Sequence, residues 1–251
     1  RYPLPHDVLG AHLNDGVVTI RSVHHLADSV EVLTQDHTYL ATHEHGGVWV
    51  CVFAAEDIPD YRLRVTYGDH SQVVDDPYRF LPTVGEMDTY LISEGRHERL
   101  WEVLGAHLMH FDGVMGPVDG VAFAVWAPNA QAVRVVGDFN FWDGTGHAMR
   151  TMGASGVWEL FIPGVGVGAR YKFEIQGPSG NWFQKADPMA RATEIPPATA
   201  SVVTDVFHTW NDEDWLRARE DANPHSGPMS IYEVHAGSWK QDLGYRGLAD
   251  E

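Results

Sequence analysis

Residues 61–67, YRLRVTY, alternate in character along the chain. Every second side chain from Tyr61 to Tyr67 is apolar or aromatic, and polar side chains separate them. This two-residue period is typical of a β-strand that buries one face. Residues 171–176, YKFEIQ, repeat the pattern, with Tyr, Phe and Ile on one face and Lys, Glu and Gln on the other. The two stretches predict equivalent strands in two copies of one module.

Further landmarks extend this duplication over most of the chain. They occur in the same order in both copies, and the spacing between the copies only grows, as insertions in the second copy would cause. We therefore interpret the chain as an internal repeat. The matched pairs are VLGAHL at 8–13 and 103–108, GVW at 47–49 and 156–158, YRLRV at 61–65 with YKFEI at 171–175, and DPY at 76–78 with DPM at 187–189.

Short strands separated by turn signals predict the fold class. Turns such as NDG at 14–16 and SG at 179–180 punctuate them. This spacing favours an all-β chain of two tandem immunoglobulin-like β-sandwiches, the first over residues 1–92 and the second over 93–222. The other expected strands are 16–22, 29–33 and 48–53 in the first copy, and 120–126, 132–136 and 157–162 in the second.

Two segments have the pattern of helices. Residues 93–105 predict a helix that begins after Ser93 as N-cap and stops at Gly105. Residues 212–219, DEDWLRAR, predict a short helix whose acidic first turn suits the helix dipole.

The last part of the chain has no counterpart in either copy. Residues 223–228, NPHSGP, predict a linker, and residues 229–235, MSIYEVH, predict the start of a new strand. Because the chain opens on Arg1 and stops at Glu251 in a helix-like pattern, we expect both ends to be cut.

Composition excludes several classes of function. The formal net charge is −18, whereas nucleic acids and anionic membranes require a positive surface. A neutral polymer such as a polysaccharide is compatible with this charge. No run of apolar residues is long enough to span a membrane, and no signal peptide opens the chain. The single cysteine, Cys51, lies in the apolar run VWVCVF and predicts a buried thiol, which suits a reducing cytoplasm.

Three segments of the sequence match motifs of a known protein family. Residues 7–12 are DVLGAH, residues 123–130 are FAVWAPNA with VGDFNFW following at 136–142, and residues 230–239 are SIYEVHAGSW. In these segments the chain resembles the part of bacterial glycogen branching enzymes that precedes the catalytic barrel. The matches are to the first N-terminal module, to a family 48 carbohydrate-binding module, and to the first strand of a (β/α)8 barrel. Ala236 stands where that family commonly has Leu, a small departure.

The resemblance implies a function for the parent protein. Such enzymes cleave an α-1,4-glucan and transfer the segment to a 6-hydroxyl, forming an α-1,6 branch. Their two catalytic carboxylates lie at the ends of later barrel strands. Residues 223–251 would hold only the linker and the start of a truncated barrel, so no catalytic residue is assigned here and the chain alone is expected to be inactive. The implied partners are α-glucan (glycogen or maltodextrin) and the enzyme's own barrel, without a cofactor.

Three residues of the second copy match the sugar platform of related glycogen-binding modules. Trp142, Lys172 and Trp182 correspond to the Trp of FNxW, the Lys of YKF and a Trp in the next turn. Aromatic rings stack on the apolar faces of sugars, and an ammonium bonds the hydroxyl rim. The alternatives are packing for Trp142, interdomain contact for Trp182 and a solvated side chain for Lys172.

Neighbouring residues favour structural roles. We expect Trp126 in the core and Asn140 as a turn former. In the first copy Ser22 takes the place of Trp126, and no FNxW motif follows, so we interpret that module as a spacer.

Other candidate sites are weaker. His43 and His45 stand two apart without an evident third metal ligand, which favours a solvated loop. The glycine-rich run 164–168 has no helix after it, which favours a hairpin turn over a phosphate loop.

Other functional classes remain open on the sequence. They are a debranching or trehalose-releasing hydrolase, a stand-alone glycogen-binding protein, and a structural immunoglobulin-like pair used in adhesion, which the lack of paired cysteines disfavours.

Overall fold

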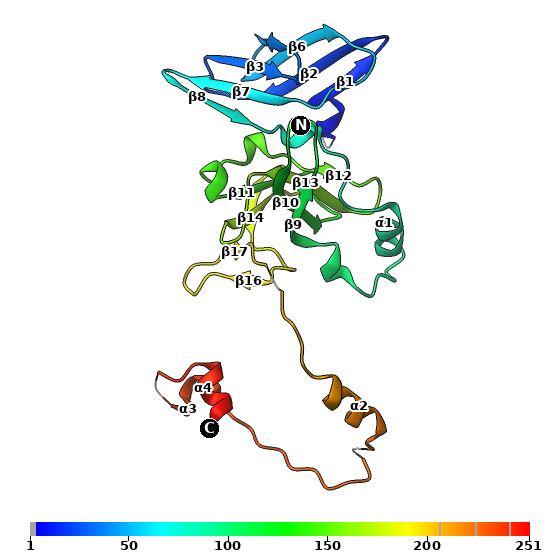
Figure 1. The fold of residues 1–251 in the computed structure, drawn as a ribbon, viewed down its shortest axis with the longest axis vertical. Helices are drawn as coiled ribbons and strands as arrows, with labels where there is room; N and C mark the ends of the chain where they lie inside the picture. The colour runs from blue at the N-terminus through cyan, green and yellow to red at the C-terminus, as the bar shows by residue number, and fades with distance from the viewer. Residues whose placement is uncertain (1–3, 206, 224, 241) are drawn as a thin grey trace. The chain divides into compact units, whose positions relative to one another are not determined.

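The computed structural model describes residues 4–205, 207–223, 225–240 and 242–251 (Figure 1). The chain divides into two compact units, Arg1–Val206 and Phe207–Glu251. The first unit holds two β-sandwiches, which run from blue to cyan and from green to yellow in Figure 1. The all-β expectation for this unit is confirmed.

The first sandwich consists of two antiparallel four-stranded sheets. Its core lies between them and includes Ile20, Val30 and Leu63. One sheet has the order β1 (Gly10–Asn14), β2 (Val17–Val23), β6 (Val48–Ala54), β5 (Thr42–His43); the other has the order β4 (Thr38–Leu40), β3 (Ser29–Leu33), β7 (Arg62–Tyr67), β8 (His70–Val74).

The second sandwich repeats this arrangement with additional strands. Its core includes Phe123, Val135 and Phe173. One sheet has the order β12 (Arg150–Thr151), β13 (Val157–Pro163), β10 (Val118–Trp126), β9 (Gly105–Phe111); the other has the order β11 (Ala132–Gly137), β14 (Arg170–Gln176), β17 (Ser201–Val202), β16 (Ala192–Thr193), with β15 (Trp182–Lys185) also paired to β14.

The predicted duplication is confirmed in equivalent hydrogen bonds. The phenol of Tyr61 donates to Asp76 Oδ2 at 2.7 Å, and that of Tyr171 donates to Asp187 Oδ2 at 2.5 Å. The indole of Trp49 likewise donates to a backbone carbonyl at 3.1 Å, as does that of Trp158. These pairs come from the matched landmarks YRLRV and YKFEI, DP, and GVW, so the sequence repeat preserves buried contacts as well as strands.

The buried carboxyl of Asp76 gives the first sandwich a defined pH response. Burial raises its pKa from 3.8 to about 6, although hydrogen bonds from Tyr78 N and the Tyr61 hydroxyl oppose the rise. Folded Asp76 therefore keeps a proton that the unfolded chain releases between these pH values. Its contribution, about 2–3 kcal/mol, is complete below the unfolded pKa and is lost as pH rises through 6.

We expect Asp76→Asn to remove this response, because an amide does not titrate: its oxygen can accept from Tyr78 N, and its NH2 group, in place of the second carboxylate oxygen, can donate to the Tyr61 hydroxyl. Denaturant unfolding of both proteins at pH 4.5 and 7.5 measures the response. The difference in free energy of unfolding, wild type minus variant, should fall by about 2 kcal/mol from pH 4.5 to pH 7.5. Parallel pH profiles for the two proteins would contradict this prediction.

The helix predicted over 93–105 is wrong. Helix α1 spans Glu86–Ser93, so Ser93 ends the helix and is not its N-cap, and Leu100–Glu102 is a single 3-10 turn. The helix ends because Gly95 adopts φ of 65° and its N–H bonds Ile92 O, the left-handed ending that glycine favours.

The glycine-rich run 164–168 is also not a hairpin. It follows β13 and precedes β14, and these strands belong to different sheets. The run therefore crosses from one layer of the sandwich to the other.

The second unit contains three short helices, α2 (Glu213–Asp221), α3 (Ala236–Trp239) and α4 (Tyr245–Asp250). The predicted helix at 212–219 is confirmed as α2, with Glu213 and Asp214 in its first turn. Residues 228–235 have no regular secondary structure, so the expected strand is not formed. In the predicted linker, Pro224 lies outside the described residues. No helix in the described part of the chain is long and apolar enough to cross a membrane.

Candidate functional site

The outward face of the sheet formed by β11, β14 and β15 holds two of the three predicted site residues. Tyr171 and Phe173 of β14 point into the core, so the alternate residues Lys172 and Glu174 lie on the outer face, where Gln176 at the end of the strand is nevertheless buried. Trp182 of β15 lies directly opposite Gln176 and shares its face. Lys172 and Trp182 are thus separated by about four residues along the sheet, roughly 13 Å.

Trp182 is held by a neighbouring cation. The guanidinium carbon of Arg134, on β11, lies 4.2 Å from the centroid of the indole ring, and Arg134 also pairs with Glu174 at 3.6 Å. The indole remains 36% exposed. Arg134 therefore covers part of the ring, and about a third of the residue's surface is left open to a ligand.

Lys172 is positioned as well. Its side chain is part-buried, and its Nζ donates to Thr199 Oγ1 at 2.8 Å. The ammonium also lies close enough to Glu194 to help lower the pKa of that carboxyl, after the larger effect of the Ala200 N–H. The ammonium thus has one protein partner through an exposed hydrogen bond, and it stays accessible to solvent or a ligand.

Trp142 lies in the turn that follows β11. The turn begins with the 3-10 helix Asp138–Asn140, and Trp142 N donates to Gly137 O at 3.0 Å. Asn140 fixes the turn, because its Oδ1 accepts from Gly137 N and its Nδ2 donates to Val135 O, both at 2.9 Å. The prediction that Asn140 is a turn former is confirmed.

A polar network links the Trp142 turn to strand β14. Arg170, at the start of β14, donates to Asp138 at 2.8 Å and to Glu194 at 3.2 Å. The pKa of Asp138 is lowered chiefly by the bond from Arg170 and to a smaller extent by one from the Trp142 side chain. The turn that carries Trp142 is therefore linked through Asp138 and Arg170 to the strand that carries Lys172.

His147 contacts the Trp142 turn through the side chain of Asn140. Burial lowers the pKa of His147 to about 4, so the ring is neutral at neutral pH. The Asn140 amide lies 3.0 Å from its Nδ1. A neutral ring there accepts the amide hydrogen bond, which keeps the turn in one conformation near pH 7.

Sequence reasoning missed the supporting residues Arg134, Asp138, Arg170 and Glu194. Arg134 carried one usable signal, because it occupies an outward position in the alternating strand AVRVV. The other three act through contacts between segments far apart in the chain, for which single-strand periodicity has no signal.

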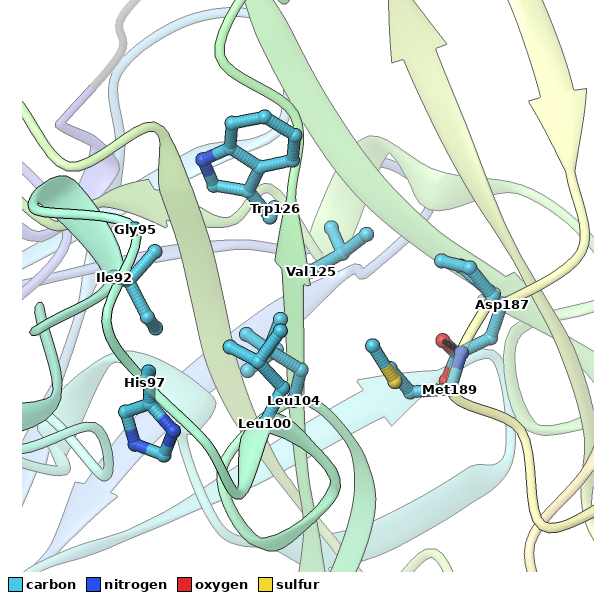
Figure 2. A pocket seen from close by; sticks show the side chains of 11 residues that line it. Ile92, Gly95, His97, Leu100, Leu104, Val125, Trp126, Asp187 and Met189 are labelled. Atoms are coloured by element: carbon cyan, nitrogen blue, oxygen red, sulfur yellow. Dashed lines mark hydrogen bonds between the residues drawn. The ribbon is translucent and has the colours of Figure 1, made fainter.

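A separate apolar pocket of about 370 Å³ lies beside the second sandwich, and Figure 2 shows Trp126 above it. The prediction of Trp126 as core is wrong: it is 55% exposed, and its Nε1 donates to Ser155 O. The polar groups here are already paired, His97 with Asp88 and Asp187 with Tyr171. The lining residues are Ile92, Gly95, His97, Leu100, Leu104, Ala124, Val125, Trp126, Asp187, Pro188 and Met189.

This pocket accordingly offers apolar surface and few free hydrogen-bonding groups. A sugar would bury hydroxyls there without partners, at a cost of about 1–3 kcal/mol each. The outward face of β11, β14 and β15 is the better candidate for a polar ligand.

Ser22 was expected to be the first-sandwich counterpart of Trp126, and strand register corrects this. Ser22 lies opposite Trp49, as Val125 lies opposite Trp158, so Val23 and not Ser22 is the equivalent of Trp126. His43 and His45 do not belong to a cluster of metal ligands: no group of three potential metal ligands occurs within the residues that the structure describes.

Comparisons with known proteins match both sandwiches. Residues 2–78 match the family described as alpha-1,4-glucan branching enzyme GlgB, N-terminal domain. Residues 103–190 match carbohydrate-binding module 48 (isoamylase N-terminal domain). The second match includes β11, β14 and β15 and therefore all three predicted site residues.

Curated relatives match over almost the whole chain. The 1,4-alpha-glucan branching enzyme GlgB of Thermobifida fusca is 55% identical over 249 residues, covering 98% of this chain. The chain corresponds to the N-terminal region of the branching enzymes. Streptomyces coelicolor GlgB 1 is 53% identical over 248 residues, and Leifsonia xyli GlgB is 52% identical over 258. The chain spans 33%, 31% and 34% of the lengths of these three relatives.

Proposed function

We propose that this chain is the glucan-binding N-terminal region of a 1,4-α-glucan branching enzyme. The parent enzyme would cleave an α-1,4-glucan and transfer the released segment to a 6-hydroxyl, creating an α-1,6 branch. The observation that carries the proposal is the sheet face with Lys172 and Trp182, next to the turn that carries Trp142, within the segment that matches a carbohydrate-binding module. The proposed division is a scaffold sandwich at 1–92, the binding sandwich at 93–222 and the barrel start at 223–251.

The chemistry of the face suits an uncharged polysaccharide. Each glucose ring has an apolar C–H face that stacks on an indole, and its hydroxyls bond to an ammonium or carboxylate. Trp142 and Trp182 would supply the stacking surfaces and Lys172 a donor. A neutral glucan tolerates the net charge of −18, which opposes nucleic acid and anionic membrane as partners.

Residues 230–235 would form the first strand of the parent enzyme's barrel. A parallel barrel strand takes its hydrogen bonds from two neighbouring strands, and its structure depends on them. The irregular backbone of 228–235 is compatible with a segment whose neighbours belong to another part of the parent protein. That barrel is the proposed internal partner, and the cytoplasm, where the single cysteine stays reduced, is the proposed location.

One experiment separates binding from catalysis. In glycogen-containing native gels the 251-residue chain should migrate more slowly than in plain gels, whereas a soluble β-linked glucan should not retard it. Incubation of the same chain with amylose should form no α-1,6 linkages, because the catalytic carboxylates are expected in later barrel strands. Equal migration in glycogen-containing and plain gels would refute the binding function. New α-1,6 linkages in the amylose would overturn the assignment of catalysis to the barrel.

A further inference from the structure

Phe141 has an unusual environment for a large apolar side chain. It exposes 95% of its surface, the highest value for such a residue in the described part of the chain. A ring in this position buries almost no area and so contributes almost nothing to the core. Its retention on the turn therefore needs a reason other than packing.

The backbone at this position is also strained. Phe141 has φ of 54° and Trp142 has φ of 63°, so two consecutive residues with bulky side chains adopt the left-handed region. L-residues other than glycine avoid this region because Cβ approaches the following carbonyl oxygen. Such outliers persist only where surrounding contacts impose them, and they concentrate at ligand-binding sites.

Contacts on both sides impose the conformation. Before the aromatic pair, the Asn140 side chain bonds both Gly137 N and Val135 O. After the pair, Asp143 N donates to Asn140 O at 3.0 Å, and Asp143 Oδ1 accepts from Thr145 N at 3.0 Å. The Phe141 ring is therefore presented to solvent from a fixed backbone, which reduces the entropy that binding would cost.

We propose that Phe141 is a further glucan-contacting residue, stacking on a sugar adjacent to the one bound by Trp142. The inference rests on the proposed glucan-binding function. An α-glucan is the chosen occupant because Phe141 directly precedes Trp142 and lies within the segment matched to a carbohydrate-binding module. A strand of linked sugars presents successive apolar faces, which a preset pair of aromatic rings complements.

Titration calorimetry of the intact chain with maltoheptaose tests this assignment. Phe141→Ala and Phe141→Gly should each weaken binding about three- to tenfold, the loss of one aromatic stacking contact. Phe141→Tyr keeps the ring and should bind like the wild type. Phe207→Ala is the matched control, since Phe207 is 85% exposed and lies outside residues 103–190, the segment matched to the carbohydrate-binding module.

A stability readout distinguishes a binding role from a structural one. Glycine suits a positive φ, and the ring of Phe141 packs on little, so Phe141→Gly should keep or raise the thermal midpoint while it weakens binding. A clear fall in the midpoint would show that the ring is structural and overturn the inference.

The affinities also separate this inference from the function on which it rests. Wild-type affinity in both Phe141 truncations, with weakened binding in Trp142→Ala, would refute the role of Phe141 alone. Unchanged binding in Trp142→Ala as well would refute the proposed platform itself.

Discussion

Replacing Glu159 by alanine is expected to lower the free energy of unfolding by about 3–5 kcal/mol, the cost of leaving a buried charge without its partner. Glu159 is fully buried on β13 and pairs with the buried Arg150. It also accepts hydrogen bonds from Thr83 N at 3.2 Å and from Thr83 Oγ1 at 2.7 Å. Alanine at 159 removes every one of these acceptors at once.

The destabilisation caused by Glu159→Ala should extend beyond the second sandwich. Arg150 also donates to Phe80 O, and Phe80 and Thr83 belong to the segment that joins the two sandwiches. Nearby, the Tyr78 hydroxyl accepts from Ala148 N at 2.9 Å and lies 3.1 Å from Gly146 O. Glu159 therefore anchors the connection as well as its own sheet.

Denaturant unfolding of Glu159→Ala measures this cost. The pair Arg64–Glu31, whose side chains are 42% and 30% exposed, supplies the control, because Glu31→Ala should cost less than about 1 kcal/mol. Replacing both members, as in Arg150→Met with Glu159→Leu, should recover much of the loss, since no unpaired charge is left. Similar small losses for Glu159→Ala and Glu31→Ala would show that the buried pair does not anchor the module.

The second large effect concerns binding. The double variant Trp142→Ala, Trp182→Ala is expected to weaken glucan binding by at least about tenfold, because it removes both proposed stacking surfaces. In glycogen gels this loss should abolish the retardation of the chain. Thermal unfolding should change little by comparison, since Trp182 is partly exposed and Trp142 lies in a surface turn.

A matched double variant controls for the loss of two tryptophans. Trp101 and Trp126 are each 55% exposed and lie outside the platform, on the 3-10 turn Leu100–Glu102 and at the end of β10. Trp101→Ala with Trp126→Ala should leave retardation unchanged. Equal losses in the two double variants would remove the reason for assigning binding to the β11–β14–β15 face.

The sandwich architecture was predictable from local pattern. Strands with clean alternation, such as 61–67, were found because a half-buried strand imposes a two-residue period on its own sequence. Strands β8 and β15 were missed because they are largely exposed, and exposed positions carry little hydrophobic signal. The helix at 93–105 was misplaced because glycine at 95 ends α1, a conformational effect that outweighs the apolar residues after it.

The candidate site was predictable only in part. Its three central residues were proposed from residue type and motif, whereas the contacts around them could not be predicted. Arg134 reaches Trp182 across paired strands, and Arg170 joins Asp138 to Glu194 from separate parts of the chain. Trp126 was placed in the core because it ends an apolar strand, yet the sheet ends there and the ring lies at the edge of a pocket.

The central claim is that α-glucan binds at the sheet face holding Lys172 and Trp182 together with Trp142 of the turn that follows β11. The most direct measurement is an NMR titration of the ¹⁵N-labelled chain with maltoheptaose, observing the indole N–H signals of its nine tryptophans. Single Trp→Phe variants assign each signal. We predict that the Trp142 and Trp182 signals shift with a common affinity while those of Trp101 and Trp126 stay in place. Saturable shifts confined to other tryptophans, or none at all, would contradict the account.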